Sequence, residues 1–296
     1  MLENDKMAID SEIKKQVREF YDQVGWQEVS EGLYQNARYE DLRPVSREYI
    51  QRCHLRVQQH LKPDGQLLLD AGSGPIQYPE YLEYSRGYQY RVCVDISIVA
   101  LQEARKRIGN HGLFVVADIA NLPFKPDCFD GVVSLHAIHH LPPQEHKRAF
   151  EELYRSLKPG CNAVVVNGWS QSLLMNLYNA PIHWVEGLYA LKQSGFKRNT
   201  HLKINRPSTQ KAITNRQGTF VSKHNAAWLT HQVGAAMPLS IWVWRSVTVR
   251  FLRTFIHERR GGRSLLRFLF WLEERFPHFF GKYGQYPLIE IRKPQP

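Results

Sequence analysis

Gln66–Pro75 reads QLLLDAGSGP, a short apolar run that ends in an aspartate and a glycine-rich turn. A continuous apolar run of this length is typical of a parallel strand that is buried on both faces. Gly72 and Gly74 allow a tight turn and let the backbone approach a ligand closely. The stretch therefore predicts a strand and turn at the edge where α/β sheets bind their ligands.

Strands and helices alternate on both sides of this stretch. Helices are expected over 10–24 and 44–60, and then over 97–108 and 143–157, with another ending near residue 86. The expected strands are 66–71, 90–95, 112–117, 129–135 and 162–166. Strands that alternate with helices of ten or more residues predict βαβ units and a parallel, doubly wound sheet.

The alternation stops after residue 168 and resumes weakly later. A helix is expected near 172–191, followed by a polar basic loop over 195–211. Further elements are expected over 225–236 (helix), 239–249 (strand, apolar except Arg245 and Arg250), 262–276 (helix) and 286–293 (strand). These patterns predict four regions: a helical cap or lid (1–62), a ligand-binding core (63–168), an inserted acceptor-side segment (169–222), and a completion of the core (223–296) with a basic aromatic helical insertion at about 251–281.

Three aspartates stand where successive strands end. Asp70 ends the first expected strand of the core, Asp95 ends the second, and Asp118 follows the third. Parallel strands of an α/β sheet end at one edge, so these carboxylates should lie together. The second can accept hydrogen bonds from both hydroxyls of a ribose, and the third can accept from an adenine amino group. The pattern predicts a site for an adenosine-bearing molecule.

The glycine-rich turn separates two candidates for that molecule. A dinucleotide site has the pattern G-x-G-x-x-G and places a pyrophosphate on a helix N-terminus. Gly72 and Gly74 are followed by no third glycine, and Asp70 stands two residues before the first. A negative charge there disfavours a pyrophosphate and favours a cationic ligand that carries an amino acid. The turn therefore favours S-adenosylmethionine over NAD.

Five segments resemble the successive motifs of class I S-adenosylmethionine-dependent methyltransferases. They are LLLDAGSGP (67–75), VCVDIS (92–97), ADIANLPF (117–124), FDGVVSLHAIHHLP (129–142) and LKPGCNAVVV (157–166). The resemblance covers about residues 60–168 and is nearest to the small-molecule and lipid-modifying branch that includes quinone-biosynthesis methyltransferases. It implies a Rossmann-like, doubly wound α/β fold with a mostly parallel seven-stranded sheet, a helical N-terminal cap and insertions. It also implies that S-adenosylmethionine is the cofactor.

The resemblance assigns roles residue by residue. Asp70 and the turn would line the methionine part, Asp95 would hold the ribose, and Asp118 would bind the adenine amino group. Apolar neighbours would pack on the adenine, and the end of the fourth strand would lie near the transferred methyl. The cofactor-binding residues implied are Asp70, Gly72, Ser73, Gly74, Asp95, Ile96, Asp118, Ile119 and Leu135.

Histidines cluster after the fourth strand of the core. His136 and His140 have the i, i+4 spacing of metal ligands on a helix, but they begin in a strand-end loop without an obvious acidic partner. We therefore expect no metal site and favour a loop that closes the cofactor pocket. A neutral imidazole near the acceptor could also act as a general base. The candidate catalytic residues are His139 and His136.

Aromatic residues near the N-terminus have two interpretations. Tyr21, Trp26 and Tyr34 either pack in the core or lid, or cover the sulfonium, because an aromatic face attracts a cation.

Basic residues are concentrated in the last hundred positions. The chain has 296 residues and a formal net charge of +11, and residues 197–296 hold 18 Lys and Arg against 4 Asp and Glu. In the expected helix 262–276, Arg263, Arg267 and Glu274 form a narrow polar stripe. The rest of that helix is either buried, against the core or a second subunit, or inserted in a membrane surface. In the second case, arginines would contact anionic headgroups: Arg250, Arg253, Arg259, Arg260 and Arg263.

These features leave three functions open. The main hypothesis is a methyltransferase acting on a small-molecule or lipid-like acceptor, at an oxygen, nitrogen or carbon atom. The alternative is an RNA methyltransferase, although the fourth strand ends in SLHA and lacks an N-P-P-Y motif. A non-catalytic adenosine-binding module is the third. The first residues lack the apolar segment of a signal peptide, and the four cysteines show no C-x-x-C spacing. We therefore expect a cytoplasmic protein, with peripheral membrane contact and an oligomeric state left open.

Overall fold

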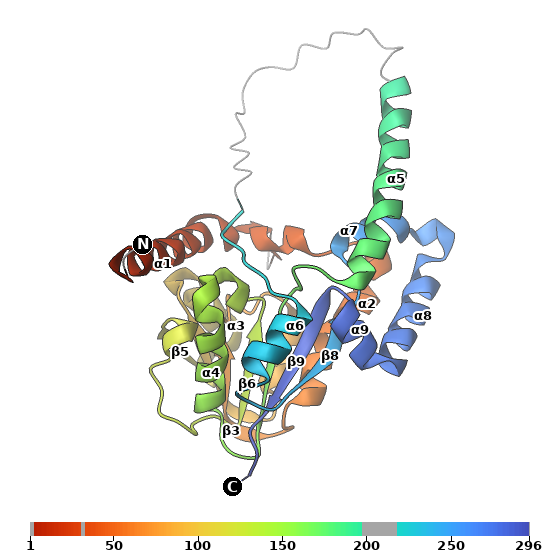
Figure 1. Cartoon of the computed structure of the whole chain (residues 1–296). Helices are drawn as coiled ribbons and strands as arrows, with labels where there is room; N and C mark the ends of the chain where they lie inside the picture. Colours follow the sequence, from red (N-terminus) through yellow and green to blue (C-terminus); the bar gives the residue numbers. More distant parts are fainter. Residues whose placement is uncertain (1–2, 31–32, 197–217, 296) are drawn as a thin grey trace.

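A seven-stranded sheet forms the centre of the computed structural model, which describes residues 3–30, 33–196 and 218–295 (Figure 1). Its strand order is β5-β4-β3-β6-β7-β9-β8. The strands are β3 (Gly65–Ala71), β4 (Tyr88–Asp95), β5 (Gly112–Val116), β6 (Gly131–Leu135), β7 (Asn162–Val166), β8 (Leu239–Arg245) and β9 (Tyr286–Arg292). Strands β3 to β7 pair in parallel, and β9 runs antiparallel to both of its neighbours. This is the expected doubly wound, mostly parallel sheet.

Apolar residues of the strands are buried on both faces of the sheet. Leu68 and Leu69, which are adjacent in β3, belong to two different clusters of buried side chains. One cluster lies under α4 (His146–Ser156) and the segment that begins with α6 (Ala226–Trp228), and the other lies under α3 (Ile98–Ile108). The alternation of side chains along a strand explains this division.

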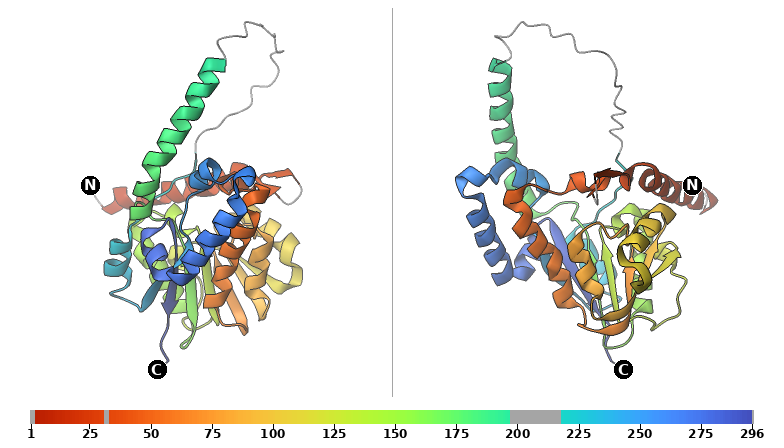
Figure 2. Two further views of the ribbon diagram at one scale, coloured as in Figure 1. Left: turned by 90° about the vertical axis from the view of Figure 1, so that its right-hand side faces the viewer. Right: turned by 180° about the vertical axis from the view of Figure 1, so that it is seen from behind.

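A third cluster joins elements from the two ends of the chain. Its helices are α2 (Pro44–Leu55), α7 (Val249–Phe255) and α8 (Gly262–Arg275), and α9 (Pro277–Tyr283) packs on β8. Helix α5 (Leu173–Phe196) stands out from the rest of the molecule in all views (Figures 1 and 2).

The N-terminal part forms a cover over one end of the sheet. It contains α1 (Glu3–Phe20), a π turn (Tyr21–Gly25) and the short hairpin β1–β2 (Glu28–Ser30 and Leu33–Tyr34). Neither the hairpin nor the early end of the first helix was predicted. Lys14 of α1 reaches Asp118, just after the end of β5, and Figure 1 shows α1 above α3 and α4.

Other expected elements also differ from the structure. The helix expected to end near residue 86 is instead a 3-10 helix, Pro79–Ser85, and arginines bind carbonyl oxygens in it and before it. Arg107 donates to the oxygens of Ile76 and Gln77, and Arg91 donates to that of Tyr81. The strand expected to reach Val249 ends at Arg245, since Thr248 caps α7 by accepting from the amide of Phe251.

Candidate active site

All eleven residues that the sequence assigns to the cofactor or to catalysis line one cavity. The cavity has a volume of about 450 Å³, which lies within the range of small-molecule sites, roughly 300–1,000 Å³. It opens where the strand order reverses, between β3 and β6, at the carboxyl ends of the strands. The eleven residues are Asp70, Gly72, Ser73, Gly74, Asp95, Ile96, Asp118, Ile119, Leu135, His136 and His139.

The turn after β3 requires its glycines. Gly72 has φ +78° and Gly74 has φ +53°, in the left-handed region that favours glycine. A Cβ at Gly72 would lie 2.2 Å from that of Ala137, and one at Gly74 would lie 3.0 Å from the Trp26 ring. Any side chain at either position would push into the loop after β6 or into the N-terminal cover.

Asp95 is the carboxylate at the centre of the predicted cofactor site. One oxygen accepts from the Gly74 amide and the other from the Ser97 amide, both at 2.9 Å. Each oxygen keeps a further lone pair, so the side chain can still accept from two hydroxyls. Burial raises the pKa of Asp95 to about 6, against the lowering effect of the two amides. The protein thus holds this acid in a fixed orientation with little solvation.

The charge of Asp70 is not free, contrary to the prediction from the sequence. Its carboxylate accepts from Nε of Arg91 at 2.9 Å, and both side chains are buried. The negative charge that was expected to favour a cationic ligand is therefore compensated within the sheet. Asp70 still lines the cavity, but the preference for a cationic ligand does not follow from a free charge there.

The N-terminal cover contacts three parts of the predicted cofactor site. Lys14 bridges Asp118 and Glu145 at 2.6 Å to each. Asp22 accepts a hydrogen bond from the Ser97 hydroxyl. The Tyr21 and Trp26 rings are stacked, with centroids 5.0 Å apart, and Trp26 lies against Gly74. Trp26, stacked on Tyr21, therefore lies over the glycine turn, while the contacts of Lys14 were not predicted.

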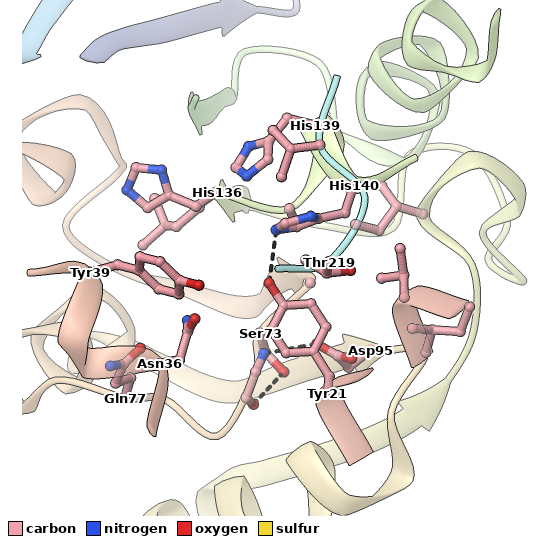
Figure 3. Close-up of a pocket in the computed structure, with 18 of the residues that line it drawn as sticks. Tyr21, Asn36, Tyr39, Ser73, Gln77, Asp95, His136, His139, His140 and Thr219 are labelled. Carbon is pink, nitrogen blue, oxygen red and sulfur yellow. Dashed lines mark hydrogen bonds between the residues drawn. The ribbon is translucent and has the colours of Figure 1, made fainter. Parts of the chain in front are cut away.

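The three histidines after β6 have different surroundings. His140 is held by the Phe220 carbonyl at Nδ1 and by the Tyr21 hydroxyl at Nε2, each at 2.8 Å; the second bond is dashed in Figure 3. With both nitrogens engaged, His140 cannot act as a metal ligand. Among the described residues, no group of three potential ligands is arranged to hold a metal ion.

His139 has the geometry of a base. Its Nδ1 donates to the side-chain oxygen of Asn167 at 3.1 Å, which leaves a lone pair on Nε2. Burial keeps the pKa of His139 well below its usual value, so the ring is neutral at physiological pH. His136 has φ +55°, a strained conformation for a residue with a side chain, and burial lowers its pKa to about 3.

The cavity also contains charged residues that were not predicted as site residues. Arg245 and Glu40 form a buried ion pair in its wall, and although burial raises the pKa of Glu40, Arg245 lowers it to about 2. The sequence signal for Arg245 was a charge inside an apolar strand. Lys223 also lines the cavity.

A family model and two tRNA methyltransferases match part of the chain in sequence. Residues 69–165 match a family model described as a methyltransferase domain. The tRNA (carboxymethyluridine(34)-5-O)-methyltransferase of Arabidopsis thaliana is 34% identical over 109 residues, 36% of this chain and 25% of its own length. The probable tRNA methyltransferase 9B of Mus musculus is 32% identical over 126 residues, 41% of this chain and 26% of its own length. The chain thus spans about a quarter of the length of these relatives.

Solved structures of methyltransferases share the fold. Phosphoethanolamine N-methyltransferase 1 of Haemonchus contortus has a TM-score of 0.55 at 9% identity, over 96% of this chain and 49% of that one. Geranyl diphosphate C-methyltransferase of Streptomyces coelicolor A3(2) has a TM-score of 0.51 at 16% identity, over 95% and 98%. Residues 69–165 therefore match a methyltransferase domain, and the chain shares the class I fold with these solved methyltransferases.

Proposed function

We propose that the whole chain is a methyltransferase that moves a methyl group from S-adenosylmethionine to a small-molecule or lipid-like acceptor inside the cavity. The observation that carries the proposal is one continuous cavity. It is lined by the glycine turn and Asp95 at one side and by His136 and His139 at the other. A donor and an acceptor held in such a cavity are brought in line and kept dry, which accounts for much of the rate.

The residues around the glycine turn fit the cofactor. S-adenosylmethionine supplies an electrophilic methyl group on a sulfonium. Asp95 would hold the ribose hydroxyls with its free lone pairs, and Asp118 would face the adenine. The stacked Tyr21 and Trp26 would cover this side, where an aromatic face favours a positive charge.

The residues after β6 and β7 would act on the acceptor. His139 would take a proton from an acceptor hydroxyl or amine through Nε2, while Asn167 holds the ring in the required tautomer. The buried Trp244 and the neighbouring Tyr286 line the cavity on this side and would exclude water. An acceptor without a proton at the reacting atom would not need His139.

The pKa of Asp95 makes cofactor affinity depend on pH. A protonated Asp95 can accept fewer hydrogen bonds from the ribose, so bound cofactor favours the ionised form. Because the pKa in the free protein is about 6, affinity should be constant above pH 7 and fall by up to about tenfold per pH unit below 6. Calorimetric titrations with S-adenosylhomocysteine between pH 5 and 8 measure this. The Asp95→Asn variant should show no such step, and equal wild-type affinity at pH 5 and 7.5 would contradict the assignment.

RNA is the second candidate acceptor. It is favoured by the local sequence identity to tRNA methyltransferases and by the basic last third of the chain. However, several arginines of that region already have carboxylate partners: Arg250 with Glu186, Arg263 with Glu258, and Arg267 with Glu48. The N-terminal cover also lies over the cavity, so we favour a small acceptor.

Transfer of a labelled methyl group separates the two candidates. The purified chain is incubated with methyl-tritiated S-adenosylmethionine and either an RNA fraction or a small-molecule and lipid fraction. We expect label in the second fraction only. Label in RNA would replace the main proposal by the alternative. The quinone-methyltransferase-like branch stays a prediction that the identity of the labelled product would test.

An apolar face of α8 supports a further proposal, contact with a membrane surface. Leu265, Phe268 and Trp271 lie three residues apart and are each about half exposed, while Leu266 and Phe270 are buried on the opposite face. The rest of the chain thus covers this helix on one side only. No helix in the described ranges is long and apolar enough to cross a bilayer. We expect the wild type to float with phosphatidylglycerol vesicles and the Trp271→Ser variant to lose this binding. Equal flotation of the two proteins would contradict the proposal.

A further inference from the structure

Residues 218–224 form a segment without helix or strand in the wall of the cavity, which we call the strap. The strap is fixed from two sides. Its Phe220 carbonyl accepts from His140 Nδ1, and its Ser222 amide donates to the His139 carbonyl, both at 2.8 Å. On the other side, the Ser170 amide donates to the His224 carbonyl at 2.9 Å. The strap is therefore tied to both the histidine loop and the segment after β7.

Alternate side chains of the strap line the cavity. They are Thr219, Val221 and Lys223, as expected when every second residue of an extended chain faces the same way. Thr219 is drawn beside His140 in Figure 3. Of these three positions, Lys223 brings a positive charge into the cavity.

Lys223 differs from the other cations of the cavity in having no carboxylate partner among the described residues. Lys14 is paired with Asp118, Arg91 with Asp70, and Arg245 with Glu40. The fourth acid of the lining, Asp95, is held by backbone amides. All four acids of the lining thus have other partners, and Lys223 is the cation without a carboxylate partner among the described residues of the lining.

Lys223 is half-buried in the wall of the cavity. Its Nζ lies 3.1 Å from the place where a Cβ of Gly168 would be, so a glycine after β7 makes room for the ammonium group. The Gln285 amide lies at 3.3 Å from the same point and is neutral. Burial lowers the pKa of Lys223, which is the effect expected when no anion compensates the charge.

An uncompensated cation in a half-buried place opposes folding, since a charge loses solvation there without gaining a partner. The neighbouring histidines do not help, because His136 and His139 are neutral. An anionic group on a ligand would compensate the positive charge of Lys223. The end of β7 and the histidine loop lie on the acceptor side, whereas the ribose is assigned to Asp95 at the end of β4.

We propose that Lys223 binds an anionic group, a carboxylate or a phosphate, on the methyl acceptor and so orients the acceptor beside His139. The inference rests on the proposed function, because it takes the cavity to hold cofactor and acceptor together. The acceptor is then an organic acid or phosphate ester whose less polar part lies against Trp244 and Tyr286.

Stability without ligand gives the first test. The variant Lys223→Met keeps the length of the side chain and removes its charge. We expect a melting temperature about 2 °C higher than that of the wild type. The same substitution at the exposed Lys62, near the opposite end of β3, is the control and should have no effect. A clearly lower melting temperature for Lys223→Met alone would show that the ammonium group has a stabilising partner, and would overturn the proposal.

Binding of matched probes gives the second test. Benzoate, phenyl phosphate and benzyl alcohol are titrated into the full chain, with and without saturating S-adenosylhomocysteine. We expect at least one anionic probe to bind the wild type and Lys62→Met about tenfold more tightly than benzyl alcohol does. Lys223→Met should lose this difference, and Lys223→Arg should keep most of it. The stronger of the two anions identifies carboxylate or phosphate as the preferred group.

The outcomes separate this proposal from the proposed function. Equal binding of anions by Lys223→Met and the wild type, or no preference for anions in the wild type, overturns the role of Lys223. A loss of S-adenosylhomocysteine affinity in Lys223→Met would assign the lysine to the carboxylate of the cofactor instead. Failure of the wild type to bind S-adenosylhomocysteine would contradict the proposed function, whatever the probes show.

Discussion

Replacing Asp95 by alanine should weaken the binding of S-adenosylmethionine about 100-fold. A hydrogen bond to a charged group contributes about 1.5–3 kcal/mol, and a tenfold change in affinity corresponds to about 1.4 kcal/mol. Loss of two ribose contacts would exceed this value, but water can enter the vacated space and recover part of it. The substitution also removes the acceptor that fixes the Gly74 amide, so the glycine turn loses a restraint. Titration calorimetry at pH 7.5 measures the effect.

The contribution of Asp95 to the stability of the folded chain should change with pH in the direction opposite to cofactor affinity. The pKa of Asp95 is about 6 in the folded protein and about 4 in an unfolded chain, so the folded state binds the proton more tightly. The ionised carboxylate therefore opposes folding above pH 6, and its contribution to stability should fall as the pH rises from about 4 to 6. Asp64→Ala, an exposed position outside the cavity, is the control for affinity. Unchanged cofactor affinity in Asp95→Ala would refute the ribose assignment.

Replacing Glu273 by alanine should destabilise the chain by about 3–5 kcal/mol, the cost of leaving a buried ion-pair partner uncompensated. Glu273 is fully buried and accepts from Tyr49, Ser246 and Arg56, which belong to different parts of the chain. Arg56 in turn donates to the carbonyl of Trp244 in the cavity wall. Equilibrium unfolding in urea measures the change in the free energy of unfolding. We also expect the substitution to disorder α8 and the part of the cavity wall around Trp244.

Glu274 offers a matched control for this variant. It is the next residue on α8 and binds the same Arg56, at 2.8 Å, but 43% of its side chain is exposed. An exposed partner contributes about 0–1 kcal/mol, so Glu274→Ala should unfold almost like the wild type. Similar losses for the two variants would show that burial is not what makes the Glu273 network important.

The sheet and the cofactor side of the cavity could be predicted because their signals are local. An apolar run, a glycine turn and an acid at each strand end are short patterns, and they fix both the strands and the edge where they end. The predicted strand 162–166 matches β7 residue for residue. The predicted site residues meet in one cavity because the ends of parallel strands converge in any such sheet.

The rest depends on contacts between residues far apart in the chain. Lys14 reaches Asp118, and Glu40 reaches Arg245 across 205 positions, so no local pattern could have revealed either pair. Arg91 in β4 compensates Asp70 in β3 only because the strands are neighbours. The 3-10 helix Pro79–Ser85 stands next to arginines from other elements, and Arg91 binds the Tyr81 carbonyl within it. The loop expected over 195–211 lies almost wholly outside the described residues.

Calorimetric titration of the full chain with S-adenosylmethionine tests the central claim most directly. The cavity at the ends of β3, β4 and β6 predicts one molecule bound per chain, with binding of S-adenosylhomocysteine at the same site and none of NAD. The absence of any heat of binding at millimolar S-adenosylmethionine would contradict the account of this cavity as a methyltransferase site.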